Sequence, residues 1–224
     1  MDETKTQEAF AKASQAMFRA ITARYDLTNA IITGGINLAW YRTFINTILE
    51  QQAPTAVLDL CCGTGAVTKR LVAAMDARKL PRPTIDCVDF SCPMIAQARH
   101  QLEKRNINAR CIEADIRALP LPDGSYDTVC LAYGIRNIPD QKAALTEAAR
   151  LLRPKGRLFI LELTPPPSAF FRFLHSAYLK TIVPVVGGLL TRHIKPYTYL
   201  RKSIETFSVP DLMNTLQELS LIHI

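Results

Sequence analysis

Hydrophobic and polar positions alternate along this chain with two different periods. Over residues 4–24 and 38–50, apolar side chains recur about every three to four positions, which predicts two helices ahead of the first strand. The polar segment 25–29 separates these helices, and Thr28 or Asn29 is expected to cap the helix that follows it. We interpret residues 1–50 as a helical preamble to the main fold.

From residue 56 onward, short apolar runs alternate with helical patterns. Helices are predicted at 93–104 and 141–152, capped by Ser91 and Asp140. Runs that are apolar at nearly every position are typical of parallel strands covered on both faces. The predicted fold class is therefore α/β, a Rossmann-like, doubly wound, mostly parallel sheet with helices on both faces. The predicted strands are 56–59, 84–89, 109–113, 126–133 and 157–163.

The first strand leads into a glycine-rich turn. Asp59 ends the strand, the turn runs from Cys61 through Gly63 to Gly65, and a helical pattern carrying Thr68 follows. Glycines let a backbone approach a ligand closely, and a helix start offers unpaired N–H groups. The turn therefore predicts a nucleotide-like ligand, either a dinucleotide or S-adenosylmethionine.

Acidic residues follow the next two strands. Asp89 ends the second strand, 24 residues after Gly65, where an acid usually binds ribose hydroxyls. Asp115 follows the third strand, where its carboxylate can accept a hydrogen bond from an adenine amino group. Together with Asp59, these carboxylates would repel a pyrophosphate, but they suit a cofactor with a cationic sulfonium or ammonium group. The acids favour S-adenosylmethionine over a dinucleotide.

Composition narrows the class of protein. The 224 residues are 48% apolar, which fits a single domain over residues 1–224. The six cysteines match no metal-ligand spacing, so we expect reduced thiols, no metal site and a cytoplasmic location. The first eight residues are polar and resemble no secretory or transit signal, and no unbroken apolar run reaches the ~18 residues of a membrane span.

Charge is concentrated in one part of the sequence. Residues 150–202 carry ten Lys or Arg and one acid, Glu162, a local charge of +9 against +7 for the whole chain. An unusually apolar segment, 168–190, lies in this stretch and begins an apolar and basic insertion at 168–205. This pattern fits either peripheral contact with an anionic membrane surface or a solvated basic face. Nucleic acid is not expected, because aromatic and basic residues are not interleaved.

Three segments resemble a class I S-adenosylmethionine-dependent methyltransferase: residues 58–68, 88–94 and 114–120. The sequence Ser125-Tyr-Asp127 and the element Gly134-Ile-Arg-Asn137 narrow the resemblance. They are similar to the UbiE/MenG family, the C-methyltransferases of ubiquinone and menaquinone biosynthesis. The segment Tyr197-Thr-Tyr-Leu-Arg201 also fits, and the similarity covers roughly residues 20–219.

The resemblance implies the cofactor S-adenosylmethionine and a prenylated quinol substrate, either demethylmenaquinol or 2-polyprenyl-6-methoxy-1,4-benzoquinol. It assigns Arg136 to stabilising a developing phenolate or orienting a basic water, and Asn137 to holding that water or a ring oxygen. Tyr25, Tyr197 and Tyr199 are expected to line the quinol pocket. The expected cofactor-binding residues are Asp59, Gly63, Gly65, Thr68, Asp89, Met94, Asp115 and Ile116.

Several alternatives remain open. Arg136 can instead form a structural ion pair, and Asn137 can cap the next helix. The chain can methylate another small molecule or RNA, or serve as a non-catalytic scaffold of a quinone-synthesis assembly. Asn37 stands in a segment where the family usually has a His-Arg pair. The family's C-terminal strand hairpin is expected to be shortened to one strand at residues 220–224. If that strand pairs with the sheet, it forms an exposed edge at which a homodimer can form, and if it does not, one edge of the sheet is incomplete.

Overall fold

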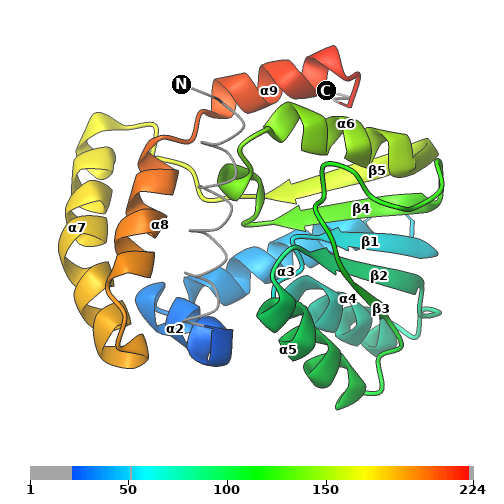
Figure 1. Cartoon of the computed structure of the whole chain (residues 1–224), viewed down its shortest axis with the longest axis horizontal. Helices are drawn as coiled ribbons and strands as arrows, with labels where there is room; N and C mark the ends of the chain where they lie inside the picture. The colour runs from blue at the N-terminus through cyan, green and yellow to red at the C-terminus, as the bar shows by residue number, and fades with distance from the viewer. Residues whose placement is uncertain (1–21, 51, 222–224) are drawn as a thin grey trace.

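Five parallel strands lie side by side at the centre of the molecule (Figure 1). The computed structural model describes residues 22–50 and 52–221. The spatial order of the strands is β3-β2-β1-β4-β5, and every pair is parallel. The order changes direction between β1 and β4, so the crevice at their carboxyl ends is the expected ligand site. The strands are β1 (Ala56–Leu60), β2 (Thr84–Asp89), β3 (Arg110–Glu113), β4 (Tyr126–Ala132) and β5 (Leu152–Leu161).

Helices cover both faces of the sheet. On one face lie α3 (Ile36–Leu49), α4 (Ala66–Ala77) and α5 (Cys92–Glu103), which pack on Val57 of β1. The opposite face, which includes Leu58, packs on α6 (Gln141–Leu151) and α9 (Val209–Glu218). Neighbouring strand residues point to opposite faces of the sheet. Because helices cover both faces, all five residues of β1 are buried. The predicted doubly wound α/β fold is confirmed.

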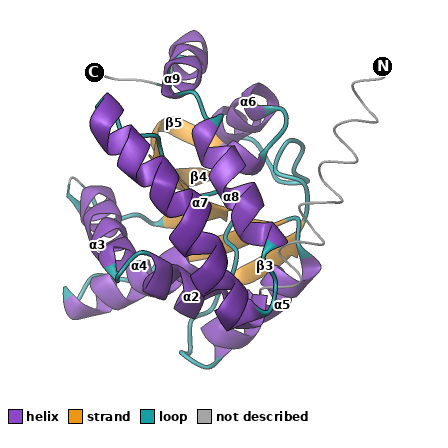
Figure 2. Ribbon diagram, turned by 90° about the vertical axis from the view of Figure 1, so that its left-hand side faces the viewer, coloured by secondary structure: helices purple, strands orange, loops and turns teal. Residues whose placement is uncertain are grey.

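A separate group of helices lies beyond the carboxyl ends of the strands (Figures 1 and 2). It consists of the short 3-10 helix η1 (Thr22–Arg24), α2 (Tyr25–Ile32), α7 (Ala169–Thr191) and α8 (Lys195–Glu205). Ile32, Leu179, Val183, Tyr197 and Ile204 form its core. We call this group the helical cap.

Helices α7 and α8 approach each other closely at one glycine. A Cβ atom on Gly187 would lie 2.5 Å from ring atoms of Tyr197. Gly187 therefore lets the Tyr197 ring pack directly on the α7 backbone. This contact sets where α8 holds its tyrosines relative to the sheet.

The structure corrects several local predictions. The segment predicted to separate two helices is itself helical, because α2 begins at Tyr25 and contains Thr28 and Asn29. Thr28 is buried together with Ile32, so burial in the cap outweighs its preference for a capping position. Ser91 occupies the N-cap position of α5, but its side chain makes no capping hydrogen bond. Asp140 caps α6 as predicted, accepting from the Ala143 N–H at 2.9 Å.

Strand β5 is longer than its apolar run. It begins at Leu152, so residues 152–156, which precede the predicted strand at 157–163, lie within it. The pairing with β4 shifts register between Tyr126 and Thr128, which accommodates these residues as an irregularity at the start of the strand. Of the predicted helix at 4–24, residues 4–21 lie outside the described residues, as do residues 222–224 of the predicted strand at 220–224.

Candidate functional site

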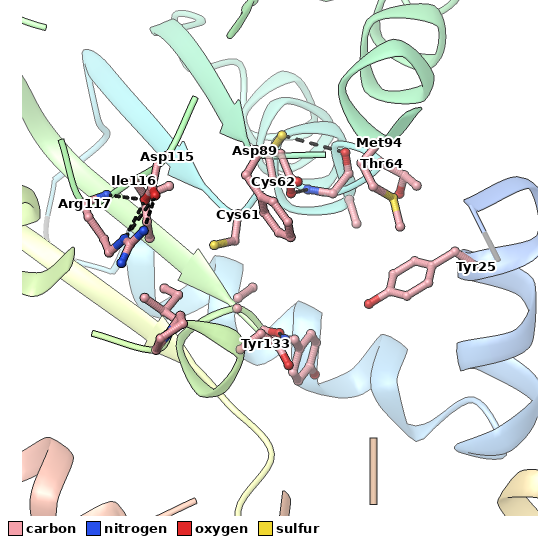
Figure 3. A pocket seen from close by; sticks show the side chains of 18 of the residues that line it. Tyr25, Cys61, Cys62, Thr64, Asp89, Met94, Asp115, Ile116, Arg117 and Tyr133 are labelled. Atoms are coloured by element: carbon pink, nitrogen blue, oxygen red, sulfur yellow. Dashed lines mark hydrogen bonds and ion pairs between the residues drawn. The ribbon is translucent and has the colours of Figure 1, made fainter. Parts of the chain in front are cut away.

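Two cavities with shared walls lie between the sheet and the helical cap. The first has a volume of about 960 Å³ and the second about 690 Å³, both including their open mouths. Tyr25, Tyr41, Tyr133 and Asn137 line both of them. Figure 3 shows the first cavity, with Tyr25 extending from α2 and with Asp89 and Met94 among its walls. A molecule in one cavity is therefore next to a molecule in the other.

The glycine turn forms one wall of the first cavity. Cys61, Gly63 and Gly65 all have left-handed backbone conformations, with φ values of 53°, 54° and 74°. A Cβ atom on Gly63 would meet no other atom within 4 Å, so the backbone is open on that side. This exposed backbone is the approach that a nucleotide-like ligand needs.

Asp89 is the charged group at the centre of the first cavity. Its carboxylate is 6% exposed and accepts hydrogen bonds from the Gly63 and Ser91 N–H groups, each at 2.9 Å. Burial raises the pKa of this carboxyl to about 6. No ion pair to a cation involves Asp89 in the described part of the chain. The remaining lone pairs of Asp89 are available to hydroxyl donors, such as those of a ribose.

The other predicted cofactor residues divide into two groups. Met94 and Ile116 are buried walls of the first cavity, which suits an adenine ring. Asp115 also lines this cavity, and it pairs with Arg117 at 2.7 Å. The hydrogen bond from Arg117 lowers the pKa of the Asp115 carboxyl, so it remains ionised at the cavity mouth.

Asp59 and Thr68 do not border either cavity. Asp59 is 1% exposed and accepts from the Thr68 hydroxyl at 2.7 Å and the Thr68 N–H at 3.3 Å. Burial raises the pKa of Asp59 to about 7. These two residues tie the end of β1 to the first turn of α4, behind the wall that the cofactor residues form. Gly65 likewise shapes the turn from behind, against Ala98 and Leu102 of α5.

Arg136 belongs to the second cavity. It lies in the 3-10 helix η2 (Ile135–Asn137), directly after β4. Its Nη1 forms an ion pair with Glu162, and the two side chains are only 6% and 3% exposed. Its Nε donates to the Ser203 hydroxyl at 3.3 Å, and Nη1 also donates to the Tyr133 carbonyl at 3.0 Å. The Nη2 group has no hydrogen-bond partner within residues 22–50 and 52–221.

Asn137 is fixed from two sides. Its Nδ2 donates to the Tyr133 carbonyl at 3.3 Å, and its Oδ1 accepts from the Tyr199 hydroxyl at 3.1 Å. The alternative that Asn137 caps the next helix is wrong, because Asp140 does so. The structural ion pair foreseen for Arg136 is present. The structure thus brings together all five residues predicted for the acceptor side: Tyr25, Arg136, Asn137, Tyr197 and Tyr199.

Among the wall residues that sequence reasoning missed are Asn37, Tyr41 and Tyr133. Asn37 and Tyr41 are four positions apart on α3 and both line the second cavity. The Tyr41 ring meets the Tyr133 ring edge to face at 5.5 Å, and the Arg70 guanidinium lies 4.3 Å from the Tyr41 ring centre. The available signal was Asn37 itself, a polar residue on the apolar face of a helix, because a buried amide normally needs a hydrogen-bond partner.

The turns after β1 and β4 contact each other. A Cβ atom on Gly134 would lie 2.5 Å from the Cys61 Cβ. Cys61 and Tyr133 both have left-handed backbones, which is unfavourable for residues with side chains. Such conformations cluster at functional sites, where the surrounding structure maintains them.

Asp26 links the helical cap to the glycine turn. Its carboxylate accepts from the Thr64 hydroxyl, at 2.9 Å and 3.0 Å to its two oxygens. Lys69 of α4 adds an ion pair at 3.4 Å. These contacts hold α2, and with it Tyr25, over the first cavity.

The fold and the site define a class I S-adenosylmethionine-dependent methyltransferase. The sheet order, the glycine turn and a buried acid at the end of β2 are all present, and the first cavity is lined by the carboxylates of Asp89 and Asp115. The chain belongs to the ubiE/COQ5 methyltransferase family, whose model matches residues 3–221.

Named relatives and solved structures agree with this family. A demethylmenaquinone methyltransferase of Thermus thermophilus is 39% identical over 200 residues, covering 89% of this chain and 88% of the relative. A ubiquinone/menaquinone biosynthesis C-methyltransferase of Stutzerimonas stutzeri is 29% identical, covering 90% and 78%. A structure from Methanococcus maripaludis, described as an S-adenosyl-L-methionine-dependent methyltransferase, has a TM-score of 0.61 at 20% identity, covering 89% and 84%. This last likeness supports the fold.

Proposed function

We propose that this protein transfers a methyl group from S-adenosylmethionine to a ring carbon of a prenylated quinol, in menaquinone or ubiquinone biosynthesis. The observation that carries the proposal is the wall that the two cavities share, formed by Tyr25, Tyr41, Tyr133 and Asn137. A methyl donor in the first cavity would meet an aromatic ring in the second. The relatives named as demethylmenaquinone methyltransferases support this acceptor class.

The first cavity would hold the cofactor. Asp89 would accept hydrogen bonds from the ribose hydroxyls. Met94 and the Ile116 backbone would contact the adenine, and Asp115 would accept a hydrogen bond from the adenine amino group. When bound, S-adenosylmethionine supplies an electrophilic methyl group. The protein then has to align the acceptor carbon and raise its nucleophilicity.

The second cavity would activate the ring. A ring carbon becomes more nucleophilic as the neighbouring hydroxyl ionises, and phenolic hydroxyls titrate near pKa ~10. The unpartnered Nη2 of Arg136 donates to this oxygen and stabilises the phenolate. A guanidinium donates hydrogen bonds and is not a general base, so a water held by Asn137 accepts the phenolic proton. Tyr197 and Tyr199 of α8, with Tyr25 of α2, enclose the ring.

A methylation assay tests this function. Short-chain demethylmenaquinol and 2-methoxy-benzoquinol are compared as acceptors, and we expect transfer to at least one of them. Arg136→Ala is expected to lower kcat about 10²-fold or more, as loss of a transition-state donor does. Arg136→Lys keeps the positive charge and serves as the matched variant. Full activity of Arg136→Ala contradicts the assigned chemistry, and failure to bind S-adenosylmethionine in calorimetry favours the scaffold alternative.

The outer face of α7 would dock on an anionic lipid bilayer at the cytoplasmic side of the membrane. α7 is long and apolar enough to cross a membrane, yet it packs against α2 and α8 through Leu179 and Val183. In Figure 2 it lies across the outside of the helical cap. Its outward residues are Phe170, Phe171, Phe173, Leu174, Ile182, Val185 and Leu189, between 46% and 78% exposed. An amphipathic helix of this kind lies in the membrane interface.

Charge complementarity supports a lipid partner. The only acid within residues 150–202 is Glu162, which is buried in the ion pair with Arg136, while Arg172 and Lys180 are exposed on α7. Basic residues beside an apolar face increase binding to anionic headgroups. A prenylated acceptor resides in such a bilayer, so docking would bring its ring to the second cavity.

Vesicle sedimentation tests the docking surface. We expect binding to vesicles with anionic lipid and weaker binding to neutral vesicles. Arg172→Glu with Lys180→Glu should reduce the anionic preference, and Lys104→Glu, an exposed change after α5, should not. Equal binding in all cases contradicts the proposal. A concentration-dependent dimer that competes with lipid would instead assign the α7 face to a second copy of the chain.

A further inference from the structure

Three tyrosine side chains lie at the boundary between the two cavities. Tyr25 of α2, Tyr41 of α3 and Tyr133, which directly follows β4, line both of them. Figure 3 shows Tyr25 and Tyr133 on separate elements around the first cavity. A methyl group can pass from the first cavity to the second only across this boundary. In S-adenosylmethionine that methyl group is bonded to a sulfonium, so the tyrosines border the positive charge of the donor.

The ring of Tyr133 is supported on one side by Tyr41. The two rings meet edge to face, with centres 5.5 Å apart and planes at 88°. The Arg70 guanidinium lies 4.3 Å from the Tyr41 ring centre and holds Tyr41 in turn. An edge-to-face contact covers at most one face of each ring. Within the described residues no cation and no second ring contacts Tyr133, so at least one of its faces is available to a ligand.

The backbone of Tyr133 is held in an unfavourable conformation. Its φ is 58°, and a left-handed backbone is an outlier for so bulky a residue. Its N–H donates to the Leu161 carbonyl at 2.7 Å, and its carbonyl accepts from Arg136 and Asn137. Such strain is concentrated at functional sites. The Tyr133 hydroxyl oxygen has less than 1 Å² of accessible surface, so the ring, and not the hydroxyl, is the part that a ligand can contact.

We propose that the Tyr133 ring binds the sulfonium of the methyl donor, with Tyr41 as its positioning residue, and so favours the charged donor over its neutral product. Cations are attracted to the face of an aromatic ring, most strongly where water is excluded. On methyl transfer the sulfur keeps the electron pair of the broken S–CH₃ bond, and the acceptor carbon gains the methyl group and loses a proton to water. The product, S-adenosylhomocysteine, is a thioether without the sulfonium charge. This inference rests on the proposed function and adds a residue that distinguishes donor from product.

The size of the effect follows from the loss of one desolvated contact between a cation and a ring. Such a contact is worth about tenfold in affinity, which corresponds to about 1.4 kcal/mol. Asp89 and Asp115 also line the first cavity and attract a cation whether or not the ring is present. Substituting the ring therefore separates its contribution from that of the two carboxylates.

Calorimetry without an acceptor tests the inference independently of methyl transfer. The ligands are S-adenosylmethionine, S-adenosylhomocysteine and sinefungin, which has an ammonium group in place of the methylsulfonium. Tyr133→Leu should weaken binding of both cationic ligands about tenfold and leave S-adenosylhomocysteine binding unchanged. Tyr133→Gly also removes the ring and suits the left-handed backbone, so it is the second variant and should behave in the same way. Tyr133→Phe keeps the ring and should bind all three ligands as the wild type does.

Tyr126→Leu is the matched control, because it makes the same change at the opposite end of β4, where Tyr126 lines neither cavity. It should leave the ratio of S-adenosylmethionine to S-adenosylhomocysteine affinity unchanged. Tyr41→Leu removes the support of the Tyr133 ring and should lower this ratio by a smaller factor, about threefold. Circular dichroism verifies that each variant is folded.

Two results overturn the inference. An unchanged affinity ratio in Tyr133→Leu or Tyr133→Gly assigns the preference for charge to the carboxylates, and a loss in Tyr133→Phe equal to that in Tyr133→Leu excludes the ring. Methyl transfer to a quinol together with an unchanged ratio refutes the inference alone. A lowered ratio without transfer to either quinol refutes the proposed acceptor and leaves the role of Tyr133 intact.

Discussion

Replacing Glu162 by alanine is expected to destabilise this protein strongly. The carboxylate pairs with Arg136, and both side chains are at least nine-tenths buried. Removing one partner of a buried pair leaves an uncompensated charge, which costs about 3–5 kcal/mol. Glu162 also accepts the backbone N–H groups of Arg136, at 3.3 Å, and Leu163, at 2.7 Å. These further losses place Glu162→Ala at the upper end, about 5 kcal/mol.

Urea unfolding followed by circular dichroism measures this change. Glu162→Gln keeps a hydrogen-bond acceptor and loses the charge, so we expect a smaller loss of about 2 kcal/mol. Each kcal/mol corresponds to about 2–4 °C in Tm for a chain of this size, so Glu162→Ala should melt about 10–20 °C below wild type. The double substitution Arg136→Met with Glu162→Leu should recover most of the lost stability, because it leaves no unpaired charge.

An exposed ion pair provides the control. Lys142 and Glu218 connect α6 to α9 at 2.7 Å, with side chains 64% and 60% exposed. Glu218→Ala should shift the urea midpoint by no more than repeat measurements of the wild type differ, because exposed ion pairs add little stability. If Glu162→Ala stays within the same limit, the ion pair is not the structural support of η2, and the reasoning is refuted.

Other substitutions test the cofactor side and the cap. Asp59 has a native pKa of about 7 against 3.8 in model compounds, so the native state keeps its proton over this range. Stability should fall as pH rises from about 4 to about 7, and Asp59→Asn should remove that part of the slope in urea titrations at several pH values. Asp26→Ala removes the acceptor of the Thr64 hydroxyl and should speed release of S-adenosylmethionine in stopped-flow displacement. An unchanged release rate would show that this hydrogen bond does not hold α2 over the first cavity. Gly187→Ala pushes on the Tyr197 ring and should weaken hydroquinone binding in calorimetry without affecting the cofactor.

Much of the cofactor side is local in sequence and could be predicted. Continuous apolar runs locate the strands because both faces of the sheet are covered. Parallel strands bring their carboxyl ends to one edge, so Asp89 and Asp115 could be placed beside the glycine turn. Asp59 lies outside the lining of both cavities, because sequence position does not tell which side of a turn a carboxylate faces.

The acceptor side depends on contacts between distant segments. Glu162 pairs with Arg136 because β4 and β5 are neighbours in the sheet. No pattern in the sequence around either residue predicts that pairing. Likewise, Asn37 is polar on the buried face of α3, and it lines the second cavity together with residues of α8, which are distant in the sequence. The helical start at Tyr25 was missed because packing in the cap, and not local preference, makes residues 25–32 helical.

The contact between Gly134 and Cys61 has a mechanical consequence. Because Gly134 has no side chain, the Cys61 side chain in the turn beside the first cavity packs directly on the turn that leads to Arg136. A displacement of one turn therefore moves the other turn directly. The distance between a methyl donor in the first cavity and an acceptor carbon in the second would therefore be set by this contact. Substitutions in the tyrosine walls or on the α7 face would leave that distance unchanged.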